Sequence, residues 1–115
     1  MNTHEKGKIG EDAAVDYLLN NGYIVEARNF RTRRGEIDIV AFAPDGTLVF
    51  VEVKSAESTG CGNPLFRVTP DKQRTIINMA KRYMYDRGLT NTPCRMDVIG
   101  VMRGKIDHIR NAFFA

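Results

Sequence analysis

The segment GEIDIVAFAPDGTLVFVEVK, residues 35–54, constrains the fold more than any other part of the chain. Its two apolar halves predict two strands, and the Pro-Asp-Gly sequence between them predicts a hairpin turn. Strands this apolar are typical of positions buried on both faces of a sheet. Buried charges need a partner, so three residues within these strands require an explanation: Asp38, Glu52 and Lys54.

The length of the turn decides whether these charges meet. A three-residue turn pairs residue 43 with residue 47. In that register Asp38 lies opposite Glu52, with Lys54 beside them, and opposed side chains lie about 5 Å apart at Cβ. A loop of even length would instead put the two carboxylates on opposite faces of the sheet.

Two neighbouring carboxylates repel each other, and burial strengthens the repulsion. A divalent cation relieves it, because Mg²⁺ is typically held by one or two carboxylates together with waters and phosphate oxygens. A nearby ammonium group can then steady an attacking water. The residues also allow another interpretation, in which Glu52 and Lys54 lie at an exposed sheet edge and Asp38 is a solvated strand residue.

The rest of the chain predicts an α/β fold, a mixed β-sheet flanked by helices in the order α-β-β-β-α-β-β. Apolar spacing and the Asn21-Gly22 stop signal predict a first helix over residues 7–21. Thr69 as N-cap and Pro70 at the first helical position open a second helix, which ends at Gly88. The predicted strands are residues 23–30, 35–43, 47–55, 95–102 and 105–113. A basic turn over residues 31–34 is predicted to follow the first strand, and residues 56–63 are predicted to form a flexible loop.

Length and charge set further bounds. The 115 residues predict one domain, residues 1–115. The net charge is +3 and eleven of the 17 basic residues are Arg, which permits a nucleic-acid partner without demanding one. Cys61 and Cys94 lack the spacing of a zinc site or a disulfide framework. The sequence shows no signal peptide and no membrane-spanning run, so we expect no membrane partner and a cytoplasmic location.

An Asp on one strand followed by Glu-x-Lys on the next resembles the PD-(D/E)XK nuclease superfamily. Longer phrases are more specific, and together they are similar to the YraN-type family of small bacterial proteins, which resemble archaeal Holliday junction resolvases. The likeness spans about residues 7–103. Its phrases are Gly10-Glu11-Asp12-Ala13-Ala14, Tyr17-Leu18, Gly22-Tyr23, Arg28-Asn29-Phe30-Arg31, Gly35-Glu36-Ile37-Asp38-Ile39, Phe50-Val51-Glu52-Val53-Lys54 and Arg95-Met96-Asp97-Val98-Ile99.

The resemblance implies a restriction-endonuclease-like fold and a metal-dependent nuclease site. Asp38 and Glu52 would hold Mg²⁺ or Mn²⁺, with the backbone carbonyl of Val53 as a further ligand. Lys54 would orient or activate the attacking water. Glu11 matches a site residue on the first helix of the resolvase-like branch, although a Glu there also interacts favourably with the helix dipole. Junction-resolving relatives act as symmetric dimers, so a homodimer is a further expectation.

Basic residues cluster next to the proposed site. Four arginines precede the Asp38 strand, either as a solvated turn or, as their position favours, as contacts to a nucleic-acid backbone, DNA before RNA. Lys72 and Gln73 open the second helix, whose N-terminus suits phosphate. Gln73 is either satisfied in the core or in contact with the site. The arginines are Arg28, Arg31, Arg33 and Arg34.

Two functions of different classes follow. The first is a metal-dependent endonuclease that hydrolyses DNA phosphodiester bonds, with selectivity for branched DNA as one option. The second is a nucleic-acid-binding module that keeps the nuclease fold without turnover. A protein–protein adaptor is a third and weaker idea, because it leaves the carboxylates unexplained. Of the other polar residues, Asp97 is interpreted as structural, paired with Arg95 or Arg28, and His108 is given no role.

Overall fold

The computed structural model describes residues 3–56 and 68–113. It confirms the mixed α/β architecture and the order of elements predicted from the sequence. Five strands form one sheet, and two helices flank it. The elements are α1 (Thr3–Asn20), β1 (Ile24–Thr32), β2 (Gly35–Phe42), β3 (Leu48–Ala56), α2 (Pro70–Asp86), β4 (Cys94–Met102) and β5 (Lys105–Phe113).

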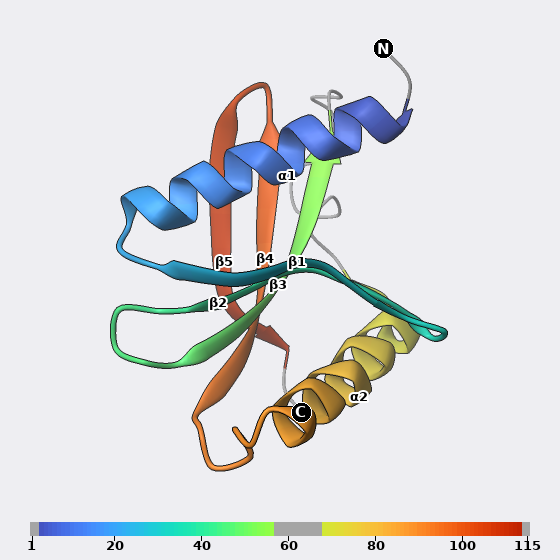
Figure 1. Cartoon of the computed structure of the whole chain (residues 1–115). Helices are drawn as coiled ribbons and strands as arrows, with labels where there is room; N and C mark the ends of the chain where they lie inside the picture. Colours follow the sequence, from blue (N-terminus) through green and yellow to red (C-terminus); the bar gives the residue numbers. More distant parts are fainter. Residues whose placement is uncertain (1–2, 57–67, 114–115) are drawn as a thin grey trace.

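The strands follow their order along the chain across the sheet, β1-β2-β3-β4-β5. Hairpins make the pairings β1–β2, β2–β3 and β4–β5 antiparallel, whereas β3 and β4 pair in parallel. A parallel pair needs a long crossover connection, and α2 lies within it. Figure 1 shows the result, with α1 across one face of the sheet and α2 on the other.

The first helix buries its apolar face against the middle of the sheet. Ala14 and Leu18 are fully buried and pack with Val49 and Val51 of β3. Close approach is possible because Gly10 carries no side chain. A Cβ atom at that position would lie 2.6 Å from the Ser55 hydroxyl oxygen, closer than such atoms pack.

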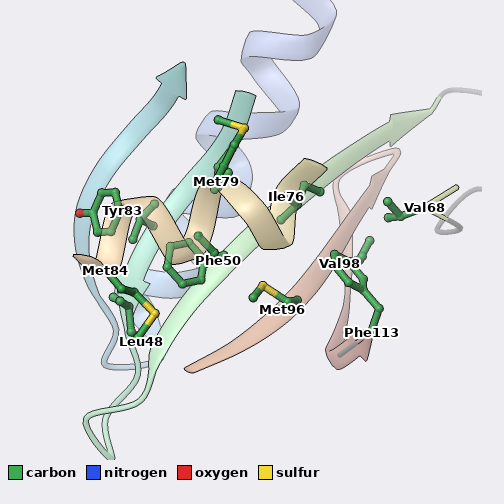
Figure 2. Close-up of a cluster of buried hydrophobic side chains, with 13 residues drawn as sticks. Leu48, Phe50, Val68, Ile76, Met79, Tyr83, Met84, Met96, Val98 and Phe113 are labelled. Carbon is green, nitrogen blue, oxygen red and sulfur yellow. The ribbon is translucent and has the colours of Figure 1, made fainter. Parts of the chain in front are cut away.

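The second helix covers the opposite face (Figure 2). Its start is as predicted, since Thr69 is the N-cap, its hydroxyl accepts the Lys72 N–H at 3.2 Å, and Pro70 is the first helical residue. Tyr83 meets Phe50 of β3 edge to face, with ring centroids 5.7 Å apart. The buried residues of this core are Ile37, Val40, Leu48, Phe50, Val68, Ile76, Met79, Ala80, Tyr83, Met84, Met96, Val98 and Phe113.

The largest departure from the predicted elements concerns the basic turn. β1 continues through Arg31 to Thr32, so the turn consists of Arg33 and Arg34 alone. The alternating side chains of this segment allow it to extend the β1–β2 ladder, and charge alone gave no reason to end the strand. Helix α1 likewise begins at Thr3 rather than at residue 7.

Some predictions fall on residues that the structure does not describe. The predicted loop over residues 56–63 lies outside the described residues apart from Ala56, which ends β3, and Cys61 lies outside them as well. Cys94 is a free, exposed cysteine. In the ranges that are described, neither helix is long and apolar enough to cross a membrane.

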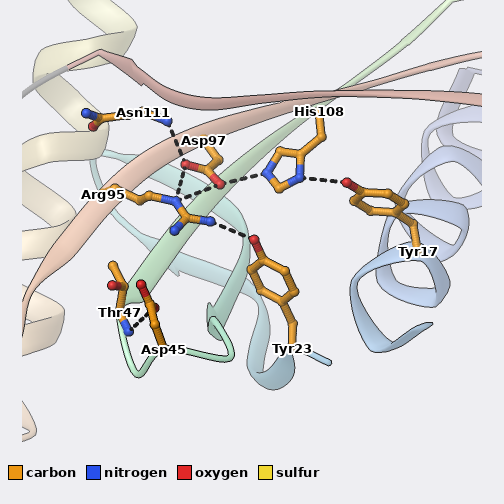
Figure 3. Close-up of polar contacts among 8 residues, drawn as sticks. All are labelled: Tyr17, Tyr23, Asp45, Thr47, Arg95, Asp97, His108 and Asn111. Atoms are coloured by element: carbon orange, nitrogen blue, oxygen red, sulfur yellow. Dashed lines mark hydrogen bonds and ion pairs between the residues drawn. The ribbon is translucent and has the colours of Figure 1, made fainter. Parts of the chain in front are cut away.

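A buried polar network ties β4 to β5 and α1 (Figure 3). Asp97 is fully buried and pairs with Arg95 at 3.0 Å, one of the two partners predicted for it. His108, which the sequence left without a role, lies between Asp97 (2.7 Å) and the Tyr17 hydroxyl (2.9 Å). Burial alone would raise the pKa of Asp97, but hydrogen bonds from His108, Asn111 and Arg95 outweigh it and lower the pKa. The network is therefore a structural clamp.

Candidate metal centre

The turn between β2 and β3 sets the register that was predicted. The Ala43 N–H donates to the Thr47 carbonyl at 2.8 Å, and the ladder runs from Phe42–Leu48 to Ile39–Val51. One further step of this register brings Asp38 level with Glu52. The three-residue turn therefore places both carboxylates on the same face of neighbouring strands.

The ladder ends where the acidic residues begin. Beyond the Ile39–Val51 pair, the Asp38 side chain takes the place of a backbone acceptor, and its Oδ2 receives the Val53 N–H at 2.8 Å. Burial, and then a hydrogen bond and charge repulsion from Glu52, raise the pKa of Asp38 to about 7. The Val53 N–H and the charge of Lys72 oppose this shift only in part.

Glu52 is the most buried carboxylate of the site, with a side chain 7% exposed. Its Oε2 forms no hydrogen bond with a described residue, and Lys72 Nζ makes an ion pair with it at 3.3 Å. Lys72 stands in the first turn of α2, so the second helix supplies the nearest positive charge. A buried oxygen that is ion-paired but accepts no hydrogen bond can still take a further ligand.

The first helix brings Glu11 to the same place. Carboxylate oxygens of Glu11, Glu36 and Asp38 lie within 4.8 Å of one another. The Glu11 side chain is only 12% exposed, on the border of the apolar face that includes Ala14. Glu36 shares a strand face with Asp38, and it was not among the candidate ligands predicted from the sequence.

Asn29 links two of these carboxylates. This role was not predicted from the sequence. Its side-chain amide donates to Glu11 Oε2 at 3.0 Å and to Glu36 Oε1 at 2.6 Å. The residue has a φ of 53°, in the left-handed region, within strand β1. Asn tolerates this conformation better than most residues, and such backbone strain concentrates at functional sites. The one sequence signal was its place in the Arg28-Asn29-Phe30-Arg31 phrase.

Two arginines predicted to contact nucleic acid form ion pairs with the acidic residues in the protein alone. Arg28 pairs with Glu11 at 3.1 Å and with Asp12 at 2.5 Å, and Arg31 lies 3.4 Å from Glu36. The hydrogen bond to Asp12, helped by Glu11, raises the pKa of the Arg28 guanidinium despite its partial burial. These arginines balance part of the negative charge in the protein alone.

The other predicted residues lie around this centre. Lys54 is half-buried two residues beyond Glu52 on β3, in register with Gly100 of β4. Gln73 donates to the Val68 carbonyl at 2.8 Å, at the start of α2, which satisfies its amide locally. Arg33 and Arg34 are exposed in the β1–β2 turn.

The arrangement fits a hard divalent cation. Carboxylate and carbonyl oxygens are the ligands that Mg²⁺ and Mn²⁺ prefer. Asp38 lies among the carboxylates of three other residues, and one of them, Glu52, has a buried oxygen that accepts no hydrogen bond from the described residues. A cation beside Asp38 would remove the repulsion that raises its pKa and give this oxygen a partner.

Comparison with known proteins places the chain among similar sequences over nearly its whole length. Residues 10–101 match the model of the uncharacterised protein family UPF0102. A UPF0102 protein of Persephonella marina is 48% identical over 108 residues, covering 94% of this chain and 92% of the relative. One of Clostridioides difficile strain 630 is 44% identical over 115 residues, covering 98% and 100%. Among solved structures, Pyrococcus furiosus SfsA in complex with Ca²⁺ aligns with a TM-score of 0.40 and 15% identity, over 95% of this chain and 64% of that chain.

Proposed function

The chain belongs to the uncharacterised protein family UPF0102, as its YraN-type phrases indicated, and from this premise we propose that it is a metal-dependent endonuclease of the PD-(D/E)XK type that hydrolyses DNA phosphodiester bonds. The observation that carries the proposal is the position of Asp38. It lies where β2 and β3 part, against Glu52 on one side and Glu11 and Glu36 on the other. A purely structural site has no need of three carboxylates around one half-buried aspartate.

The proposed roles follow from the contacts. Asp38 and Glu52 would hold Mg²⁺ or Mn²⁺, with Glu11 and the Val53 carbonyl as further ligands. The bound ion would supply a Lewis acid that polarises the phosphodiester and offsets the charge developing on it. Lys54 lies two residues beyond Glu52 on the same strand. It would orient the attacking water and stabilise charge on the transferred phosphate.

The neighbouring cations have a second role in this proposal. Arg28 and Lys72 pair with Glu11 and Glu52 in the protein alone. A cation bound between the carboxylates would release both side chains, and each could then turn to a phosphate oxygen. The proposed substrate is branched DNA, and a symmetric pair of chains would be needed to cut two strands.

The same ion pairs favour an alternative function. Arg28 and Lys72 already neutralise two of the carboxylates, so the site can persist without a metal ion. A protein of this kind would bind nucleic acid through its basic turn and would not cleave it. The two functions differ in one measurable property, turnover.

The test is a cleavage assay in Mn²⁺ with labelled single-stranded, duplex, flap and four-way junction DNA. Asp38→Asn is compared with wild type and with Asp107→Asn, a matched variant of an exposed residue on β5. The proposal expects cleavage that requires metal, is lost in Asp38→Asn and is retained in Asp107→Asn. Binding without cleavage of any substrate would establish the non-catalytic alternative, and cleavage that survives Asp38→Asn would remove the site assignment.

A further inference from the structure

A groove outside the acidic centre runs between the tip of the β1–β2 hairpin and α2. Its volume is about 520 Å³. The hairpin forms one wall with Arg31, Arg33 and Arg34, and α2 forms the other with Asn78 and Arg82. Figure 1 shows the hairpin tip reaching toward α2. The helix residues of this wall were not among the sequence candidates.

The groove has a strongly basic lining. Four arginines line it, and the acidic residue that lines it, Asp86, is paired with Arg82 at 3.0 Å. Arg33 and Arg34 stand exposed in the turn, where their guanidinium groups can reach a ligand in the groove. Arginine suits phosphate because its planar fork of donors matches two oxygens at once.

Two apolar side chains also line the groove. Phe30 is half-buried and contributes to the lining together with the buried Met79. The Phe30 ring is already fixed, since it meets Tyr83 edge to face with centroids 5.2 Å apart. Basic side chains combined with an aromatic ring are typical of grooves that bind single-stranded nucleic acid, in which arginines contact phosphates and rings contact bases.

One arginine of the groove wall also contacts the acidic centre. Arg31 belongs to its wall, and the Nε atom of Arg31 lies 3.4 Å from Glu36, a member of the acidic cluster. The hairpin rests directly on α2 at Gly35, where a Cβ atom would lie 3.0 Å from the Thr75 methyl group. Arg31 therefore links the acidic centre to the groove, so a strand held at the carboxylates would have the groove wall beside it.

We propose that this groove binds a single strand of DNA that leaves the acidic centre, with Arg33, Arg34 and Arg82 on its phosphates. The inference rests on the proposed function and specifies the form of its substrate. A volume of about 520 Å³ is in the range of pockets that enclose one compact ligand. That space suits one or two nucleotides and is too small for a duplex.

The test measures binding of a short fluorescent single-stranded DNA in EDTA, so that no cleavage is needed, over a series of salt concentrations. Three phosphate contacts predict a slope of log affinity against log salt of about −2. Arg82→Gln should weaken binding about tenfold and make the slope less steep by about 0.7. Asp86→Asn should strengthen binding roughly two- to fivefold, because it frees Arg82.

The matched control is Arg110→Gln, which removes the same charge from β5, at the opposite edge of the sheet. Equal losses in Arg82→Gln and Arg110→Gln, absent binding, or an Arg82 effect on duplex as large as that on single-stranded DNA would each overturn the inference. So would tighter binding to RNA of the same sequence. A protein that fails to cleave DNA, yet binds it through Arg82, would refute the proposed hydrolysis and leave the groove assignment standing.

Discussion

Asn29 shows how a single residue can organise a charged site. Its amide bridges Glu11 of the first helix and Glu36 of the second strand, and its backbone adopts a φ of 53° to do so. Residues other than glycine rarely adopt this conformation, although asparagine does so more often than most. The side chain and the backbone therefore contribute separately, and they can be tested separately.

We expect Asn29→Ala to be less stable than Asn29→Gly by about 1 kcal/mol. Both substitutions remove the bridging amide, but only glycine keeps the left-handed backbone without strain. Urea unfolding of both variants at one pH measures the difference. Equal stability of the two variants would show that the backbone relaxes and that the conformation is unimportant.

Asp38 predicts an unusual pH dependence for the metal-free protein. Its pKa is raised to about 7, so the folded protein binds a proton more tightly there than the unfolded chain does. This contribution to stability is fully present below the ordinary pKa of 3.8 and is lost as the pH rises through 7. The free energy of unfolding in EDTA should therefore fall between pH 5 and pH 8, and more steeply in wild type than in Asp38→Asn.

The same titration governs metal binding in the opposite sense. A cation must displace the proton on Asp38, so the affinity for Mn²⁺ should rise with pH up to about 7. Below that pH, metal binding should release a proton. Calorimetry in buffers of different ionisation enthalpy measures the proton release. An affinity independent of pH would contradict the pKa and its cause.

Strand alternation was enough to predict Asp38 and Glu52 as neighbours, because a three-residue turn fixes which residues face each other. It could not identify Asn29 or His108. Asn29 acquires its role from a local backbone irregularity, and His108 from the packing of β5 against β4 and α1. Neither leaves a periodic trace in the sequence.

At the scale of elements, the approach of α1 to β3 decides where Glu11 stands. The helix lies close to the strand because Gly10 faces the Ser55 side chain, and Glu11 is the next residue. The sequence predicted the helix and its apolar face. It gave no distance between helix and strand, since that distance depends on one missing side chain.

Gly10→Ala should therefore destabilise the protein, although alanine favours a helix interior by about 1 kcal/mol over glycine. The added methyl group would lie 2.6 Å from the Ser55 hydroxyl oxygen, so either the helix or the strand must move. Thermal unfolding measures the loss, and Gly10→Ala combined with Ser55→Gly is the matched rescue. A single variant more stable than wild type would show that the contact is loose.

For the whole molecule, repulsion within the acidic centre lowers the free energy of unfolding, and a bound cation should raise it. A ligand that binds only the folded state adds about 2.7 kcal/mol when it is present at one hundred times its Kd. We expect Mn²⁺ to raise the unfolding temperature of wild type and of Asp107→Asn but not of Asp38→Asn. An equal rise in all three proteins would indicate binding elsewhere.

The order of the elements was predictable because local signals separate successive elements, such as Thr69-Pro70 at the start of α2. The point at which β2 and β3 separate was not. It depends on the twist of the sheet and on β3 continuing beside β4 after its pairing with β2 has stopped. The site forms at that point. Its residues were therefore predictable from the sequence, but the separation of the two strands that exposes them was not.

The parallel pairing of β3 with β4 has a consequence for the newly made chain. The four carboxylates of the centre all lie within the first 52 residues of the chain, whereas β4 begins only at Cys94. A ribosome therefore releases the acidic residues and two hairpins long before the strand that completes the burial of β3. Closing that pair joins two strands that lie far apart in the sequence, which makes it the slow, non-local step of folding. Until it closes, the most apolar strand of the protein presents an open edge, and the charges at its end help to keep it from pairing with other chains.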